Sequence, residues 1–187
     1  MAIQSQSLTF EELQRLRETR DERLELIEGE LFVTPAPSLN HQDVLANSYS
    51  HFRREIVERG LGRVYFAPVD VRLAETTIVQ PDLVVVLTDR LQTLTRPRVE
   101  GAPSLVVEIV SPSTTTYDRV TKRGVYARYG VPEYWLVDYE AWTVTVFSDP
   151  KEGRYQLETE YGDTAVSATI PGLSVDLADL FAMVPGF

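Results

Sequence analysis

The stretch "PSLVVEIVSPS", residues 103–113, places Glu108 in the middle of an apolar run. A run without alternation of polar and apolar residues is typical of a strand that is buried on both faces of a sheet. An ionised carboxylate in such a strand costs several kcal/mol unless a cation or strong donors accompany it. Glu108 therefore either has a buried partner or lies on an exposed edge among half-buried neighbours.

A second apolar run, "QPDLVVVL" at residues 80–87, places Asp82 at its entrance. We expect the two runs to be neighbouring central strands, so that Asp82 and Glu108 lie side by side where the strands separate. Hard oxygen ligands that converge at the end of a sheet suit Mg²⁺ or Mn²⁺. The alternative is that Asp82 only opens a strand after Pro81 and accepts backbone hydrogen bonds.

The segment "YDRVTKRGVYARYG", residues 117–130, is expected to form the helix that follows Glu108. Asp118, Lys122 and Tyr126 are spaced four residues apart, so they share one face of that helix. We expect Lys122 to point back over the carboxylates, where a cation beside a metal-bound water assists hydrolysis of a phosphodiester. The alternative for Asp118 and Lys122 is a surface ion pair worth about 0.3–0.5 kcal/mol.

The rest of the chain predicts an α/β or α+β fold, with helices flanking a mixed central sheet and extra outer antiparallel strands. In the first half of the chain we expect a short helix in 7–22 capped by Ser7 or Thr9, a hairpin in 23–35, a long helix in 37–60, and strands in 62–75 and 77–88. A surface loop in 89–103 and a strand in 104–111 should precede the helix in 117–130, which is expected to start at Thr115, Thr116 and Asp118. The last elements expected are a strand pair in 133–149, outer strands in 154–162 and 164–172, and a short closing helix in 173–181.

Length and composition restrict the number of domains and the kinds of site that the protein can have. With 187 residues and 43% apolar content, residues 1–187 are expected to form one domain. Neither a secretory signal nor an apolar run of membrane-spanning length is visible, so we expect a cytoplasmic protein without a membrane partner. The absence of Cys excludes disulfides, thiolate nucleophiles and Cys-type zinc sites.

The charge pattern restricts how nucleic acid can be bound. A formal net charge of -10 argues against binding by bulk electrostatics, although a local basic face is still possible. Of the 18 cationic residues, only Lys122 and Lys151 are lysines, and the others are arginines. Because ammonium and guanidinium groups differ in chemistry, a lysine in this chain merits separate consideration.

The ordered set "PD", "VVEIVSPST", D-x-x-x-K, Y and "GVPEYW" resembles the Uma-two family of restriction-endonuclease-like proteins, a branch of the PD-(D/E)xK nuclease superfamily. The likeness extends from "LELIEGEL" near residue 25 to about residue 147. The resemblance implies a restriction-endonuclease-like fold, a metal-dependent endonuclease activity on DNA, and Mg²⁺ or Mn²⁺ as cofactor. It also implies pairing into a homodimer, for which the terminal strands and residues 173–181 are candidate contacts.

The resemblance assigns roles to several residues. Asp82 and Glu108 match the two metal-binding acids, whereas Val110 occupies the position where the superfamily usually has lysine. Val110 has no group for this chemistry, so the resemblance makes Lys122 the candidate lysine, moved onto the following helix. Glu25 is expected to be an auxiliary acid or base, or alternatively only a partner within its hairpin.

Two further residues complete the candidate set. His41 falls where such sequences carry a histidine, although a surface position at a helix start is the simpler interpretation. Tyr126 shares the helix face of Lys122, and the simpler interpretation is a core aromatic. The rival function is a non-catalytic nuclease-fold module for dimerisation or regulation, and a phosphoesterase acting on RNA or nucleotides is a third possibility.

Overall fold

The computed structural model describes residues 7–110 and 117–185. Its largest element is a six-stranded sheet. In sheet order the strands are β11 (Arg154–Tyr161), β10 (Thr143–Lys151), β9 (Glu133–Asp138), β8 (Leu105–Val110), β6 (Leu83–Leu87) and β3 (Gly62–Phe66). All neighbours are antiparallel except β8 and β9, which the helical crossover joins as a parallel pair. The two apolar runs thus lie side by side in the interior of the sheet, as predicted.

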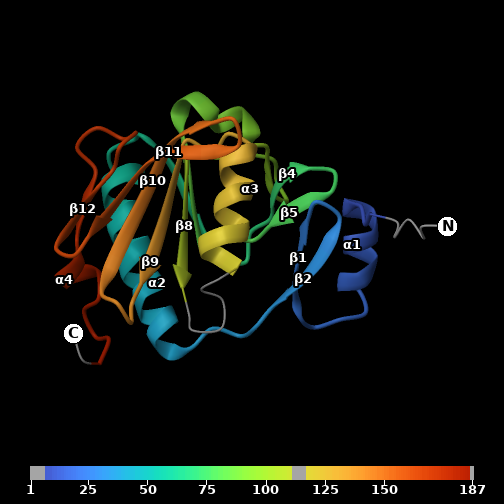
Figure 1. Ribbon diagram of the computed structural model, residues 1–187, viewed down its shortest axis with the longest axis horizontal. Helices are drawn as coiled ribbons and strands as arrows, with labels where there is room; N and C mark the ends of the chain where they lie inside the picture. The colour runs from blue at the N-terminus through green and yellow to red at the C-terminus, as the bar shows by residue number, and fades with distance from the viewer. Residues whose placement is uncertain (1–6, 111–116, 186–187) are drawn as a thin grey trace.

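One helix covers each face of this sheet. Helix α2 (Leu39–Phe52), which continues as a π-helix over Arg53–Val57, packs on one face, and α3 (Arg123–Arg128), preceded by a π-helix over Tyr117–Lys122, packs on the other (Figure 1). Side chains alternate along β8, so its odd-numbered residues join the core beneath α2, and its even-numbered residues face α3. Glu108 therefore faces α3.

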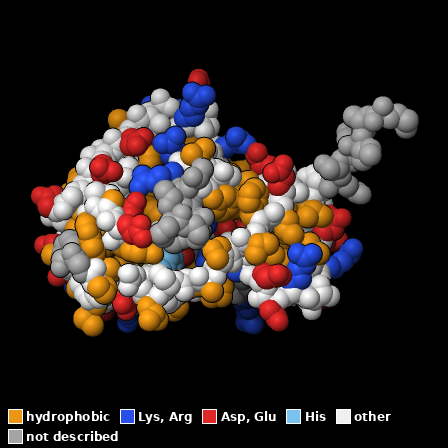
Figure 2. Space-filling model, turned by 60° about the horizontal axis from the view of Figure 1, so that its bottom comes forward, with side chains coloured by type: hydrophobic (Ala, Val, Ile, Leu, Met, Phe, Trp, Pro, Cys, Tyr) orange, Lys and Arg blue, Asp and Glu red, His pale blue; other side chains and the backbone are white. Residues whose placement is uncertain are grey.

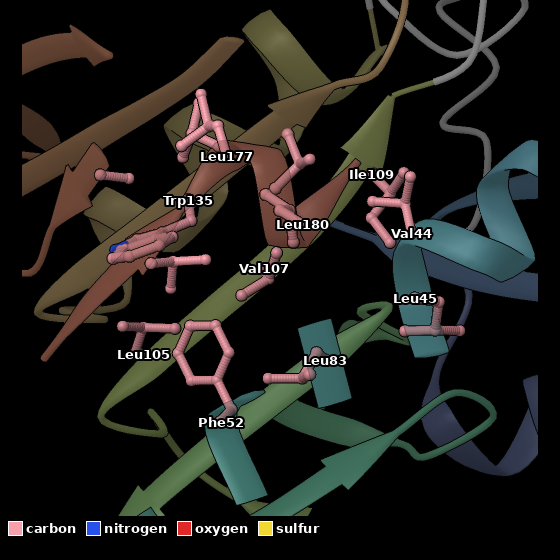
Figure 3. Close-up of a cluster of buried hydrophobic side chains, with 14 of the residues drawn as sticks. Val44, Leu45, Phe52, Leu83, Leu105, Val107, Ile109, Trp135, Leu177 and Leu180 are labelled. Atoms are coloured by element: carbon pink, nitrogen blue, oxygen red, sulfur yellow. The ribbon is translucent and has the colours of Figure 1, made fainter. Parts of the chain in front are cut away.

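The core beneath α2 is apolar throughout its centre. Figure 3 shows Phe52 from α2 beside Leu105 and Leu83 of the sheet, with Trp135 and Leu180 closing the other side. The rings of Phe52 and Trp135 meet edge to face, with their centroids 5.4 Å apart. This face of the sheet supplies packing energy, whereas the predicted site residue Glu108 lies on the opposite face.

A second, five-stranded sheet packs on the α3 side of the large sheet. In sheet order its strands are β2 (Glu30–Thr34), β1 (Arg23–Ile27), β5 (Thr77–Val79), β4 (Val71–Ala74) and β7 (Val99–Glu100). Helix α1 (Phe10–Arg17) packs against β1 and is capped by Thr9, whose hydroxyl accepts the backbone N–H of Glu12. The predicted first helix and the predicted hairpin of β1 and β2 are confirmed.

The expected strands in 62–75 and 77–88 are wrong in one respect, because each stretch forms two strands in different sheets. Pro68 follows β3, and Pro81 separates β5 from β6. Proline has no N–H to donate to a neighbouring strand, so each strand ends near it and the chain passes to the other sheet. This division brings β1 of the small sheet close to β6 and β8 of the large one.

Three smaller expectations also need correction. The expected loop in 89–103 contains a 3-10 helix (Thr88–Thr93) and β7. The expected outer strand in 164–172 and closing helix in 173–181 form β12 (Thr164–Val166), β13 (Ser174–Asp176) and α4 (Leu177–Leu180), and β12 pairs with β13 in a separate two-stranded sheet. The predicted helix start at Thr115 and Thr116 lies outside the described residues. No helix in the described part of the chain combines the length and apolar character needed to cross a bilayer.

Candidate active site

Asp82 and Glu108 lie together at the junction of β6 and β8. Asp82 immediately precedes β6, and its Oδ2 accepts the backbone N–H of Ile109 in β8 at 2.8 Å. The strands pair antiparallel with Leu83 opposite Val107, which fixes Asp82 beside Glu108. The two residues are only 4% and 2% exposed. The predicted juxtaposition of the two acids is present, and the alternative that Glu108 lies on an exposed edge is wrong.

Asp82 is held by two further groups from other elements. The Nε2 of His41, in the first turn of α2, lies 3.1 Å from Asp82 Oδ2, and Arg23 Nη1 of β1 lies 3.7 Å from Oδ1. Burial alone would raise the pKa of Asp82, but the hydrogen bonds from His41 and Ile109 and the charge of Arg23 outweigh it and lower that pKa. His41 is itself buried, so the surface interpretation of this residue is wrong.

Lys122 occupies the centre of the acidic cluster. Its Nζ lies 2.9 Å from Glu108 Oε1, 3.2 Å from Glu25 Oε2 and 3.7 Å from Asp118 Oδ1. Lys122 is 2% exposed and Asp118 is also buried, so the interpretation as a surface ion pair is wrong. Burial would lower the pKa of Lys122, but the surrounding carboxylates raise it well above its usual value. Lys122 is therefore an ammonium ion in this site.

Tyr126 completes the helix face that the spacing predicted. Its hydroxyl donates to Glu108 Oε1 at 2.6 Å, the same oxygen that Lys122 approaches. Lys122 and Tyr126 both contact Glu108 of β8, and Asp118 contacts Lys122, even though Asp118 and Lys122 lie in a π-helix and Tyr126 in α3. Tyr126 is both a core aromatic and a direct partner of Glu108.

Glu25 lies beneath Lys122 and is completely buried. Its Oε1 accepts the backbone N–H of Gln80 at 2.6 Å, and its Oε2 accepts the hydroxyl of Thr34 at 3.2 Å. The hydroxyl of Tyr117 donates to the same Oε2 at 3.4 Å. Glu25 therefore does more than pair within its hairpin, because it joins the hairpin to β5 and to the segment that carries Lys122.

The cluster contains more acids than cations. Four carboxyl groups, on Glu25, Asp82, Glu108 and Asp118, surround the cations Lys122 and Arg23. Burial raises the pKa of Glu108 to about 8. The charge of Lys122 opposes this rise, and the other three carboxyl groups add to it. The pKa values of Asp82 and Glu108 are thus shifted in opposite directions, an arrangement found at many catalytic carboxylate pairs.

Comparison with known proteins identifies the family. The Uma2 family, described as "Putative restriction endonuclease", matches residues 10–178, which is most of the chain. The chain belongs to the Uma2 family. A crystal structure of "a putative nuclease belonging to DUF820" from Anabaena variabilis aligns with a TM-score of 0.76 over 93% of this chain and 97% of that one, at 20% identity. The uncharacterized protein sll1609 of Synechocystis sp. is 25% identical over 160 residues, 84% of this chain and 90% of its own length. The predicted family and fold class are confirmed.

A cavity of about 530 Å³ gives access to the acids of this Uma2 chain. The residues that line it include Asp82, Glu108, Lys122 and His41, together with residues 34–38, which run from the end of β2 to the start of α2. Glu25 is not among the residues that line it. The cavity therefore reaches the two candidate metal ligands and the ammonium group, with Glu25 behind them.

The donor set fits a small divalent cation that retains part of its hydration shell. Among the described residues, no three His, Asp or Glu side chains form a ready-made enclosure for a metal ion. Mg²⁺ is, however, usually held by one or two carboxylates, with waters and substrate phosphates as the other ligands. Asp82 and Glu108 provide two hard oxygen donors beside the cavity, and the excess negative charge of the cluster favours a cation there.

Two contributors to the site were missed in the sequence. Arg23 lies two residues before Glu25 on β1, and residues i and i+2 of a strand share a face. That spacing could have identified Arg23 as a partner of the acids. Tyr117, whose ring centroid lies 5.4 Å from Lys122 Nζ, gave no such signal. Its position depends on the π-helix, which sequence periodicity does not reveal.

Proposed function

We propose that this Uma2 protein is an endonuclease that hydrolyses phosphodiester bonds in DNA with the aid of Mg²⁺ or Mn²⁺. The observation that carries the proposal is the buried excess of carboxyl groups around Asp82 and Glu108, next to a cavity and to one ammonium group. Burying like charges together is costly unless a cation joins them, so the arrangement favours the binding of a divalent ion.

Asp82 and Glu108 would hold the ion on the cavity side of β6 and β8. When bound, the ion lowers the pKa of a water molecule and offsets the negative charge of the phosphate. His41 and the N–H of Ile109 orient Asp82 through its Oδ2, so the carboxylate cannot rotate freely away from the cavity. This fixed orientation is the contribution that the protein makes before the substrate arrives.

Lys122 would act as a cation and not as a base. Because its pKa is raised well above the usual lysine value, it keeps its proton at neutral pH. Its N–H groups would orient the attacking water or a phosphate oxygen. Of the roles expected for Glu25, its contact with Lys122 and its distance from the cavity wall support positioning of the ammonium group more than direct metal binding.

Duplex DNA is the proposed substrate, and the products would carry 5′-phosphates, as in the superfamily that the sequence resembles. Acidic and basic side chains are intermingled on the surface in Figure 2, with no continuous basic face on the side shown. Contact with DNA would therefore depend on small basic patches and on the metal. Pairing of two chains, which would allow both strands to be cut, is part of the same proposal.

Cleavage of supercoiled plasmid in Mg²⁺ or Mn²⁺ tests the proposal directly. We expect the wild type to nick plasmid only when metal is present, and Asp82→Asn to lose this activity. Glu58→Gln is a matched control, because Glu58 is an exposed acid on the α2 side of the molecule. Activity that survives in Asp82→Asn, or that persists in EDTA, would contradict the mechanism.

The rival is a nuclease-fold module without catalysis, and the net charge of -10 favours it because such a surface repels DNA. The two proposals differ in their response to metal. A metal-dependent nuclease should be stabilised by millimolar Mg²⁺ or Mn²⁺, by about 2.7 kcal/mol at a concentration one hundred times Kd. No thermal shift, together with no nicking of plasmid, would support the rival.

A further inference from the structure

A second hollow lies on the outer side of α3, away from the acidic cavity. Its volume is about 470 Å³, and it is formed between α3 and the hairpin of β10 and β11. We call it the arginine hollow, after three of the residues that line it. Its charged and aromatic lining consists of Arg123, Arg128, Arg154, Glu158, Phe147 and Tyr155.

The guanidinium groups of the arginine hollow are accessible and only weakly engaged. The side chain of Arg123 is 42% exposed and lies 3.4 Å from Glu158, and that of Arg128 is 54% exposed and pairs with Glu28. Arg154, at the start of β11, is also exposed. Ion pairs of this exposure contribute little to stability, so a phosphate could replace the carboxylate partners at little cost.

The chemistry of the arginine hollow suits a phosphate group. A guanidinium presents paired N–H donors that match two phosphate oxygens, which an isolated ammonium group does not. Three arginines against Glu158 of the lining and Glu28, the partner of Arg128, leave the hollow with an excess of one positive charge in a chain with a net charge of -10. Arg123 lies with its guanidinium carbon 5.3 Å from the centre of the Phe147 ring, which helps to hold it over the hollow.

The arginine hollow is close to the acidic site. Arg123 follows Lys122 directly in the chain, and Tyr126, which binds Glu108, is linked to Tyr155 of the hollow through the ring of Tyr134. The two ring-to-ring steps, 5.1 and 6.5 Å, limit the distance between Tyr126 and Tyr155 to about 12 Å, the rise of about three or four phosphates along one strand of DNA. This straight line passes through the buried ring of Tyr134, so a nucleic acid that contacts both places would follow a longer path around α3.

We propose that the arginine hollow binds a backbone phosphate of the nucleic acid several nucleotides from the bond that is cut. The inference rests on the proposed function and adds to it a second contact that positions the substrate. This contact explains how an acidic protein can hold DNA without a broad basic face. Arg123 and Arg154 supply the main donors, and Arg128 assists from the end of α3.

The test measures binding of a fluorescent DNA duplex by anisotropy in Ca²⁺, between about 50 and 200 mM salt, with gels to verify that the duplex stays intact. The proteins are the wild type, the double variant Arg123→Gln with Arg154→Gln, and Arg59→Gln as control. Arg59 is 47% exposed and pairs with Glu55 on the α2 side, so it matches Arg123 in exposure and partner. Unchanged melting temperatures would show that all variants are folded.

Loss of the one phosphate contact should make the negative slope of log K against log salt less steep by about 0.9, so the double variant should bind about tenfold more weakly at low salt. Arg59→Gln should match the wild type. Unchanged slope and affinity in the double variant would overturn the inference. A second result would also overturn it: inorganic phosphate stabilises the wild type but not the double variant, while both proteins bind the duplex equally well. That result would identify a site for small anions.

Plasmid cleavage by the same preparations separates this inference from the proposed function. If the wild type cleaves and the double variant binds as the wild type does, only the arginine hollow is wrong. If the wild type binds with the expected loss of slope in the variant but never cleaves, only the catalytic proposal is wrong. If the wild type neither binds nor cleaves nucleic acid, both are wrong.

Discussion

Each face of the six-stranded sheet buries one glutamate, and the surroundings of the two differ. Glu133 is the first residue of β9. It lies two residues before Trp135 and therefore shares the face of the strand that points into the core beneath α2. Its Oε1 accepts the indole N–H of Trp135, and its Oε2 accepts the Ser167 hydroxyl at 2.9 Å and the backbone N–H and hydroxyl of Thr169 at 2.7 and 2.5 Å. All four donors are neutral, and they tie residues 167–169 to the sheet.

Glu108 faces α3 and has a different environment. Its Oε1 receives one ammonium group and one hydroxyl, three other carboxyl groups lie in the same cluster, and the residue lines a cavity. Glu133 lines neither the acidic cavity nor the arginine hollow. The comparison shows that burial alone does not indicate function. A carboxyl group satisfied by neutral donors fixes the fold, whereas one crowded with like charges beside a cavity can bind a cation.

The largest expected effect separates the two glutamates by activity. Glu108→Gln should lower the rate of metal-dependent plasmid cleavage by about 10²–10³-fold or more, because it removes one of two charged ligands from the proposed ion. Glu133→Gln should leave the rate within about threefold while lowering stability by about 1–3 kcal/mol, since its amide faces donors. Equal loss of activity in the two variants, at a temperature where both are folded, would remove the distinction.

The two lysines provide the next comparison. Lys122→Met should lower the free energy of unfolding by about 3–5 kcal/mol, because it leaves buried carboxyl groups without their cation. Lys151→Met should change it by less than about 1 kcal/mol, because Lys151 is 65% exposed and pairs with the partly exposed Asp149. Urea denaturation in metal-free buffer measures both values. A small effect of Lys122→Met would indicate that the cluster is less buried than its geometry implies.

A smaller effect concerns pH in metal-free buffer. The pKa of Glu108 rises from 4.5 to about 8 on folding, so between these values the folded chain binds one more proton than the unfolded chain. Stability should therefore fall as pH rises through this window, by at most about 1.4 kcal/mol per pH unit from this group. The lowered pKa of Asp82 affects stability only below about pH 3.8, the ordinary pKa of an aspartate, which lies outside this window.

Urea denaturation of the wild type and of Glu108→Gln at pH 6 and pH 8 tests this expectation. Glu108→Gln should show a flatter dependence than the wild type, because it has no group that titrates at this position. A fall in stability that is the same in Glu108→Gln as in the wild type would assign the effect to another group.

Much of this site was predictable because its residues follow simple periodicities. The apolar runs around Asp82 and Glu108 predicted adjacent buried strands, and the four-residue spacing of Asp118, Lys122 and Tyr126 predicted a shared face. The assignment of Lys122 came from the family resemblance, since spacing alone favours a surface pair. In each case the prediction needed only one element and its neighbour.

The features that were missed depend on contacts between distant segments. Nothing in "EYWLVD" distinguishes the buried Glu133 from a solvated acid, because its partners Ser167 and Thr169 lie more than thirty residues away. The exchange of strands between the two sheets at Pro68 and Pro81 was also missed, although both prolines were visible. Local patterns indicate where a strand stops, but the choice of the next sheet depends on tertiary packing.

Titration calorimetry with Mn²⁺ tests most directly whether Asp82 and Glu108 form a site for a divalent ion. The wild type and Glu133→Gln should each bind one ion per chain at millimolar concentrations or below, and binding should be lost in Asp82→Asn and in Glu108→Gln. Equal binding in all four proteins, or none in the wild type, would contradict the account.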